Sequence, residues 1–181
     1  MNDAPVRDVL RQANIKTKNH LMDFSDSSWQ DCPDTGRSTG VYIILYQGGT
    51  IDHGTNVPRT VEQYSTESEY NAACNAGMAL ANFRMLIHEF INKVPDIVPE
   101  KATLIVLDSK SAMCMAMNGK YIKHTRHISR RMNFVRNVEK CKIHKIDWCE
   151  GGLKLADIAT KNISEPDLTP KMRGTMVRIE K

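Results

Sequence analysis

The sequence lacks long hydrophobic runs, low-complexity tracts and paired cysteines. No stretch of about 18 apolar residues occurs, so no segment is predicted to span a membrane. The first ten residues, MNDAPVRDVL, have no apolar core of the kind found in secretory signals. The five cysteines are an odd number with no CxxC pair, which indicates free thiols in a reducing, intracellular compartment rather than a disulfide framework.

A zinc site is also poorly supported by the cysteine pattern. Cys141, His144 and Cys149 lie close together in the sequence, but their spacing fits no common zinc motif. We therefore favour buried or surface thiols and keep zinc as the weaker alternative.

Positive charge is concentrated in one part of the chain. The 181 residues suit one globular domain, with 41% hydrophobic and 25% charged residues. Residues 110–145, called here the basic segment, contain ten Lys or Arg and one acid, a net charge of +9 that leaves −5 for the rest. This asymmetry predicts a polyanion such as nucleic acid, contacted along one face. A solvated helix face is the alternative.

The hydrophobic pattern predicts a mixed α/β domain with a sheet covered by helices. The expected strands are 21–27, 40–47, 50–53, 57–61, 102–107 and 142–148, and the expected helices are 65–93, 109–117, 124–140 and 153–161. The strands before the long helix should form an antiparallel meander. The near-continuous apolar run at 102–107 is typical of a strand buried on both faces. We expect an N-terminal arm at 1–20, one domain at 21–163 and a tail at 164–181.

Four acids occupy positions that suit chemistry. Asp26 and Asp108 lie at the ends of two expected strands, Glu69 lies in the first turns of the long helix, and Asp157 lies in the last helix. If those two strands are neighbours, their acids converge at one sheet edge, where α/β proteins bind ligands. Clustered carboxylates repel one another unless a cation neutralises them, and oxygen ligands favour Mg²⁺ or Mn²⁺. Two such ions ~4 Å apart can activate water and stabilise the leaving oxygen of a phosphodiester.

The residues alone leave alternatives open for each acid. Asp26 could be a turn residue, and Asp108 could cap the helix that follows it. Glu67 competes with Glu69, because helix residues two apart point about 200° apart and only one can face a metal. Asp157 has apolar neighbours in sequence and needs a partner if it is buried.

Five motifs occur in a characteristic order between residues 21 and 163. They are FSDSSWQDCPDTGRSTGVYI, YSTESEYNAA, LDSKSAM, HTRHISRRMNFVR and LADIATK. Together they resemble the ribonuclease H domain of copia-type LTR retrotransposon polyproteins. The resemblance implies the ribonuclease H-like fold, a five-stranded mixed sheet with helices on both faces. It also implies an endonuclease that hydrolyses the RNA strand of RNA–DNA hybrids by two-metal-ion catalysis.

The resemblance assigns roles by position. It makes four acids the catalytic residues and the ligands of two Mg²⁺ or Mn²⁺ ions: Asp26, Glu69, Asp108 and Asp157. It favours Glu69 over Glu67 because Glu69 directly precedes the tyrosine of its motif. It implies hybrid binding by five residues of the basic segment: His124, Arg126, His127, Arg130 and Arg131. A monomer is expected, with an RNA–DNA hybrid and a reverse transcriptase domain as partners, in the cytoplasm, the nucleus or a virus-like particle.

The sequence departs from the family pattern at three places. Ser28 stands where the family often has a second Asp, and Ser129 stands where its basic helix usually has Asp. Residues 148–155 lack the histidine that cellular ribonucleases H carry before the last metal ligand. Glu150 and Lys154 are candidate substitutes for that histidine.

Three other functions remain as rivals. A transposase or integrase of the same fold uses three acids and extra DNA-binding domains, so the fourth acid, Asp157, favours ribonuclease H. A non-catalytic nucleic-acid-binding remnant of a reverse transcriptase would tolerate lost acids, yet all four are present. A purely structural domain within a larger reverse transcriptase is the third rival.

Overall fold

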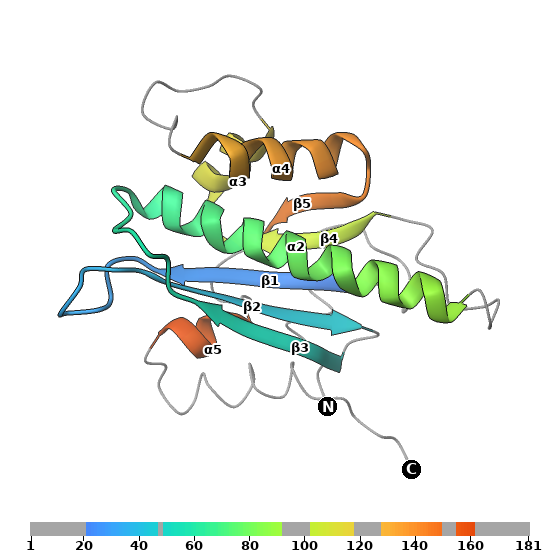
Figure 1. Cartoon of the computed structure of the whole chain (residues 1–181), viewed down its shortest axis with the longest axis horizontal. Helices are drawn as coiled ribbons and strands as arrows, with labels where there is room; N and C mark the ends of the chain where they lie inside the picture. Colours follow the sequence, from blue (N-terminus) through green and yellow to red (C-terminus); the bar gives the residue numbers. More distant parts are fainter. Residues whose placement is uncertain (1–20, 47–48, 92–101, 118–127, 150–154, 162–181) are drawn as a thin grey trace, which may run out of the picture.

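A central strand, β1 (Leu21–Ser28), organises a five-stranded sheet of order β3-β2-β1-β4-β5 (Figure 1). The computed structural model describes residues 21–46, 49–91, 102–117, 128–149 and 155–161. The other strands are β2 (Thr39–Tyr46), β3 (Gly49–Asn56), β4 (Thr103–Leu107) and β5 (His144–Trp148). The first three strands pair antiparallel, whereas β4 runs parallel to β1 and β5 runs parallel to β4. The sheet is therefore mixed, and β1 and β4 are neighbours.

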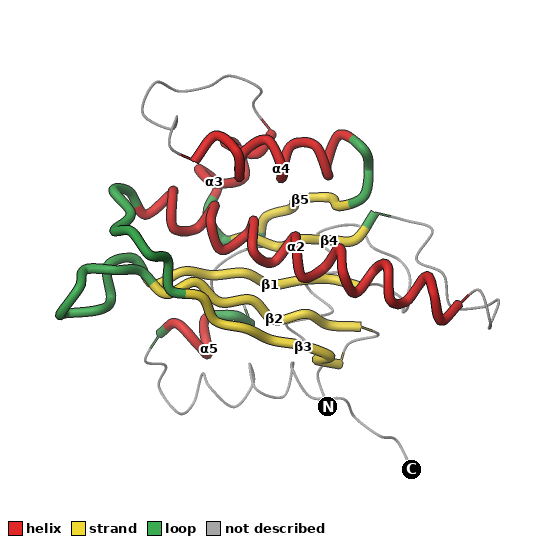
Figure 2. The backbone as a smooth tube through the Cα atoms, in the orientation of Figure 1, coloured by secondary structure: helices red, strands yellow, loops and turns green. Residues whose placement is uncertain are grey.

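Helices cover both faces of this sheet (Figures 1 and 2). On one face lie α2 (Ser65–Ile91), α3 (Lys110–Met117) and α4 (Ser129–Lys140), and on the other lies α5 (Asp157–Thr160). Each side has its own hydrophobic cluster, with Tyr70 and Met132 in the first and Phe24 and Leu155 in the second. The expected five-stranded mixed sheet with helices on both faces is confirmed.

The alternation of side chains along β1 divides its residues between these two clusters. Leu21 packs in the cluster under α2, and the Ser27 hydroxyl lies 2.8 Å from that of Ser68 on α2. Met22 and Phe24 pack in the cluster beside α5. The same alternation puts Asp26 on the α5 side, at the end of the strand where the apolar residues stop.

Two expected elements were wrong in extent. Residues 57–61 are not a strand, because β3 continues instead to Asn56 and a proline without an N–H follows at position 58. A Cβ atom at Gly54 would lie 2.6 Å from the Tyr42 ring, so only glycine lets that ring cover β3. The last helix begins at Asp157, preceded by a turn, rather than at 153. Of the expected basic helix, residues 124–127 lie outside the described residues.

A buried histidine joins β4, β5 and α2. The Nε2 atom of His144 lies 3.0 Å from the Gly77 carbonyl oxygen, and its Nδ1 atom contacts the Thr103 hydroxyl. Because a carbonyl can only accept, Nε2–H donates to Gly77, which leaves Nδ1 of a neutral ring as an acceptor facing the Thr103 hydroxyl. Burial, with a smaller effect of the Arg84 charge, lowers the pKa of His144 to about 4 despite the Gly77 hydrogen bond. The ring is therefore a neutral structural link.

This placement overturns the zinc alternative. His144 is engaged on both ring nitrogens, Cys141 is exposed after α4, and Cys149 is buried in the cluster beside α5. The three side chains do not converge. No helix within the described ranges combines the length and apolar character that crossing a bilayer requires.

Candidate active site

The parallel pairing of β1 and β4 brings two acids to one edge of the sheet. Phe24 of β1 is aligned with Val106 of β4, so the same register carried two residues further aligns Asp26 with Asp108. Asp26 is buried, and Asp108 is half-buried directly after the last residue of β4. Helix α3 takes its cap from the next residue, since the Ser109 Oγ atom accepts from the Ala112 N–H at 3.1 Å. Asp108 is therefore not that cap.

Glu69, from the second turn of α2, completes a three-acid cluster. One carboxylate oxygen from each of Asp26, Glu69 and Asp108 lies within 4.8 Å of the other two. Glu67 points elsewhere, because its Oε2 atom accepts a hydrogen bond from the Gln63 N–H at 3.0 Å. The structure thus brings Glu69, and not Glu67, to the two strand-end acids.

Asp157 reaches the same region from the opposite face of the sheet. It is the first residue of α5 and is 4% exposed. Leu155 and Ala156, which precede it, are fully buried against the sheet, and the Thr160 hydroxyl donates to Asp26. Asp157 is not one of the three acids of the 4.8 Å cluster, and a lysine links it to them.

That lysine, Lys161, follows the last residue of α5. Its Nζ atom lies 2.6 Å from Asp157 Oδ1 and 3.9 Å from Asp108 Oδ2. Partial burial disfavours the charged ammonium, but the hydrogen bond to Asp157 and the negative charges of the nearby acids outweigh it. The pKa of Lys161 is raised as a result. Lys161 was not predicted from the sequence, although its i,i+4 spacing from Asp157 was a visible signal.

Trp148 supports the backbone at Asp108. The indole Nε1–H donates to the Asp108 carbonyl oxygen at 2.8 Å, and Lys110 Nζ lies 4.3 Å from the centroid of the Trp148 ring. The end of β5 therefore holds the residue that follows β4. The other tryptophan, Trp29, donates to the carbonyl of Glu62 at 3.1 Å, and Glu62 is not one of the clustered acids.

The donor set fits a hard divalent cation. Three carboxylates this close together repel one another unless positive charge is supplied, and oxygen donors favour Mg²⁺ or Mn²⁺ over softer metals. Among the described residues, the ammonium of Lys161 supplies positive charge near them. Within the described part of the chain, no other set of three His, Cys, Asp or Glu side chains has this geometry.

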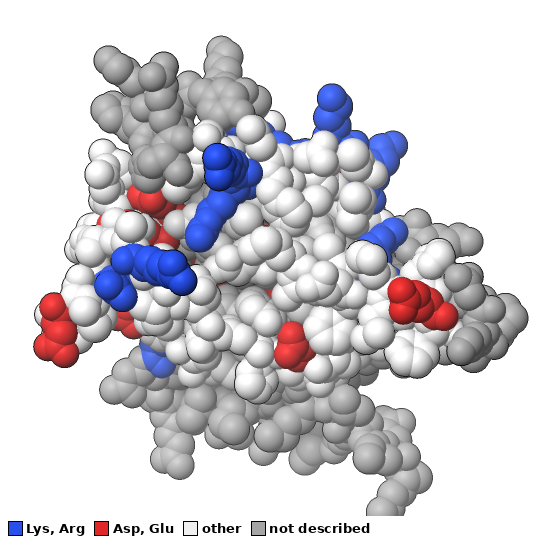
Figure 3. Space-filling model, in the orientation of Figure 1, with Lys and Arg blue, Asp and Glu red and all other residues white. Residues whose placement is uncertain are grey.

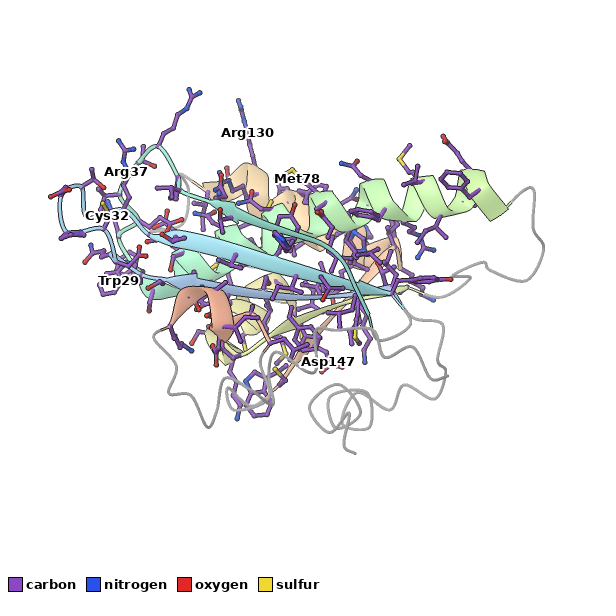
Figure 4. The ribbon with its side chains drawn as sticks, turned by 90° about the horizontal axis from the view of Figure 1, so that it is seen from below. Trp29, Cys32, Arg37, Met78, Arg130 and Asp147 are labelled. Carbon is purple, nitrogen blue, oxygen red and sulfur yellow. The ribbon has the colours of Figure 1, made fainter. Side chains whose placement is uncertain are left out.

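Part of the basic segment forms an exposed surface on α4. Figure 3 shows Lys and Arg side chains along the edge of the molecule over α4. Arg130 is exposed and projects away from the sheet (Figure 4). Side chains of α4 line an open hollow of about 580 Å³: Arg130, Asn133, Phe134, Arg136, Asn137 and Lys140.

The expected hybrid-binding residues do not share one environment. Arg131 is half-buried, with its Nη1 atom buried, and its charge partly offsets the rise that burial causes in the pKa of the Cys74 thiol. His124, Arg126 and His127 lie outside the described residues, as do Glu150 and Lys154. Of the five predicted contacts, Arg130 alone is described as exposed.

Comparison with known proteins agrees with this architecture. No protein-family model matches the chain. It is 26% identical over 144 residues to the retrovirus-related Pol polyprotein from transposon TNT 1-94 of Nicotiana tabacum, a match covering 78% of this chain and 10% of the polyprotein. The predicted resemblance to retrotransposon polyproteins is confirmed, although the chain spans only about a tenth of that relative's length.

Solved structures show the same fold. Ribonuclease H1 from the archaeon Halobacterium salinarum superposes with a TM-score of 0.55 at 14% identity, covering 79% of this chain and 95% of that one. The N-terminal ribonuclease H domain of rv2228c from Mycobacterium tuberculosis gives a TM-score of 0.52 at 9% identity, covering 86% and 97%. The fold of this chain is the ribonuclease H fold.

Proposed function

From the ribonuclease H fold and the likeness to a retrotransposon polyprotein, we propose that this protein is an endonuclease for RNA–DNA hybrids. It hydrolyses the RNA strand with two Mg²⁺ or Mn²⁺ ions held by Asp26, Glu69, Asp108 and Asp157. The observation that carries the proposal is the meeting of three carboxylates within 4.8 Å of one another at the sheet edge. The fourth acid, Asp157, is linked to this cluster by Lys161, whose ammonium lies near both Asp157 and Asp108.

The chain's own residues bind and orient. When bound, the metal ions supply an activated water and positive charge for the phosphodiester oxygens. Asp26 and Asp108 hold their oxygens at fixed strand ends, because the Thr160 hydroxyl donates to one and the Trp148 indole fixes the backbone of the other. Such outer partners keep ligating groups in place.

The substrate is proposed to lie across the acid cluster and the basic surface. Of the five predicted contacts, Arg130 is the one described as exposed and is proposed to contact phosphate, whereas contacts to ribose 2′-hydroxyls would distinguish RNA from DNA. The domain is proposed to work as a monomer inside the cell, alone or beside a reverse transcriptase domain, as in the polyprotein it resembles.

Hybrid cleavage against metal concentration tests the function. We expect wild type to cut the RNA strand with Mg²⁺ or Mn²⁺, with no cleavage in EDTA. Asp108→Asn should abolish cleavage and keep a cooperative unfolding transition, because the amide is isosteric with the carboxyl. Asp34→Asn, in the exposed turn after β1, is the matched control and should cleave like wild type. Wild type inert with both metals would favour the alternative of a non-catalytic nucleic-acid-binding remnant.

The salt dependence of hybrid binding tests the substrate surface. Arg130→Ala should reduce the slope of log affinity against log salt by about one unit, as expected for one lost phosphate contact. An unchanged slope would put the phosphate contact on another surface.

A further inference from the structure

The position of Lys161 requires an explanation that the proposed reaction does not supply. Its ammonium is one turn from Asp157 in sequence, yet it also lies 3.9 Å from Asp108, which comes from β4. An ordinary i,i+4 ion pair on a helix surface links two residues of one helix and ends there. Here the cation instead joins acids from two separate elements at the proposed metal site.

A second lysine pair shows what an ordinary pair looks like in this protein. Lys145 Nζ lies 2.8 Å from Asp147 Oδ2 on β5, and the lysine side chain is 55% exposed, close to the 51% of Lys161. The partners differ, because the Asp147 side chain is 29% exposed and that of Asp157 is 6% exposed. The two lysines are therefore alike in exposure, and only Lys161 neutralises a buried carboxylate.

The short helix α5 is held in place by polar contacts with the acid cluster. It has four residues, too few for helix formation without outside contacts. The Thr160 hydroxyl donates to Asp26, and Lys161, which follows Thr160, bonds Asp157 and lies 3.9 Å from Asp108, so the C-terminal end of α5 is attached to the acid cluster. Removing the ammonium would leave Asp157 beside other carboxylates without that compensation.

We infer that Lys161 is the internal counter-ion of the metal-free carboxylate cluster, and that divalent metal must displace its ammonium to bind there. The inference rests on the proposed metal site and concerns how that site is kept folded before loading. It has two opposite consequences. Lys161 stabilises the metal-free protein, and it lowers the affinity of the cluster for metal.

Calorimetric titration of Mn²⁺ and Mg²⁺ into the EDTA-treated, dialysed protein measures metal affinity. Thermal unfolding without metal measures the stability of the metal-free protein. Lys161→Met should bind metal roughly threefold to tenfold more tightly, since a competing positive charge is gone. Its metal-free unfolding temperature should fall by about 2–4 °C. Lys161→Arg, which keeps the charge, should stay close to wild type in both. Lys145→Met is the matched control and should change neither.

The outcomes separate the inference from the function beneath it. A purely structural role for Lys161 would lower stability and metal affinity together, so weaker metal binding by Lys161→Met overturns the inference. Equal binding by Lys161→Met and Lys145→Met also overturns it, while leaving the proposed nuclease intact. A wild type that binds neither metal rejects the proposed metal site, and the inference with it.

Discussion

The two ends of the β4–β5 strand pair bury polar side chains in opposite ways. Where the strands begin, Thr103 and His144 contact each other, His144 also bonds a carbonyl of α2, and the His144 ring is neutral. Where they end, Asp108 stands in a cluster of carboxylates that the protein's own lysine neutralises in part. A polar group whose hydrogen bonds are met internally serves the fold, whereas like charges gathered at a sheet's carboxyl edge indicate a ligand.

The largest expected effect comes from removing the His144 ring at the neutral end of the β4–β5 pair. His144→Ala should cost about 3–4 kcal/mol of unfolding free energy, because it deletes a buried side chain and two hydrogen bonds. Urea unfolding measures the loss. Metal affinity per folded molecule should remain that of wild type, and a large drop in it would show that the two ends are not separate.

Lowering the pH should reduce the stability that the neutral end of the β4–β5 pair contributes, because the buried His144 ring is uncharged in the folded protein. The pKa of His144 is about 4 in the folded protein, against an ordinary value of 6.5. The unfolded chain therefore binds more protons between these values, so this contribution is full above pH 6.5 and is lost as pH falls toward 4. We expect it to reach about 2–3 kcal/mol. Unfolding curves of wild type and His144→Gln should converge as pH falls, and parallel curves would contradict the assignment.

The smallest expected effect concerns the charged end of the β4–β5 pair, where Trp148 bonds the Asp108 carbonyl. Trp148→Phe keeps the ring and removes the N–H that bonds the Asp108 carbonyl, so metal should bind roughly tenfold more weakly. Trp29→Phe removes the comparable bond to the Glu62 carbonyl and should leave metal affinity unchanged. If both variants bind metal like wild type, the β5 end does not position Asp108.

Much of the fold could be predicted because its signals are local. The apolar run before Asp108 predicted β4, and helical spacing predicted the long helix, which the structure begins at Ser65 and describes to Ile91. The strand expected at 57–61 failed because the pairing of β3 with β2 continues to Asn56, a cross-strand register that the local pattern does not report.

Three of the predicted acids meet in the structure, but the contacts that connect them could not be predicted from the sequence. The choice of Glu69 over Glu67 needed the family motif, since both are acids in the first turns of one helix. The bond from Thr160 to Asp26 joins residues 134 positions apart, and sequence spacing cannot reveal it. Arg130 and Arg131 look equivalent as adjacent charges, yet the packing of α4 exposes one and half-buries the other.

The attachment of α5 also sets an order of assembly. The acids of β1, α2 and β4 come from the first part of the domain, whereas Asp157 arrives only with the short helix that follows β5. A sheet that forms before α5 is synthesised would carry three of the acids and neither the fourth acid nor Lys161. On the proposed mechanism, the full set of four metal ligands is assembled only when α5 docks against the sheet.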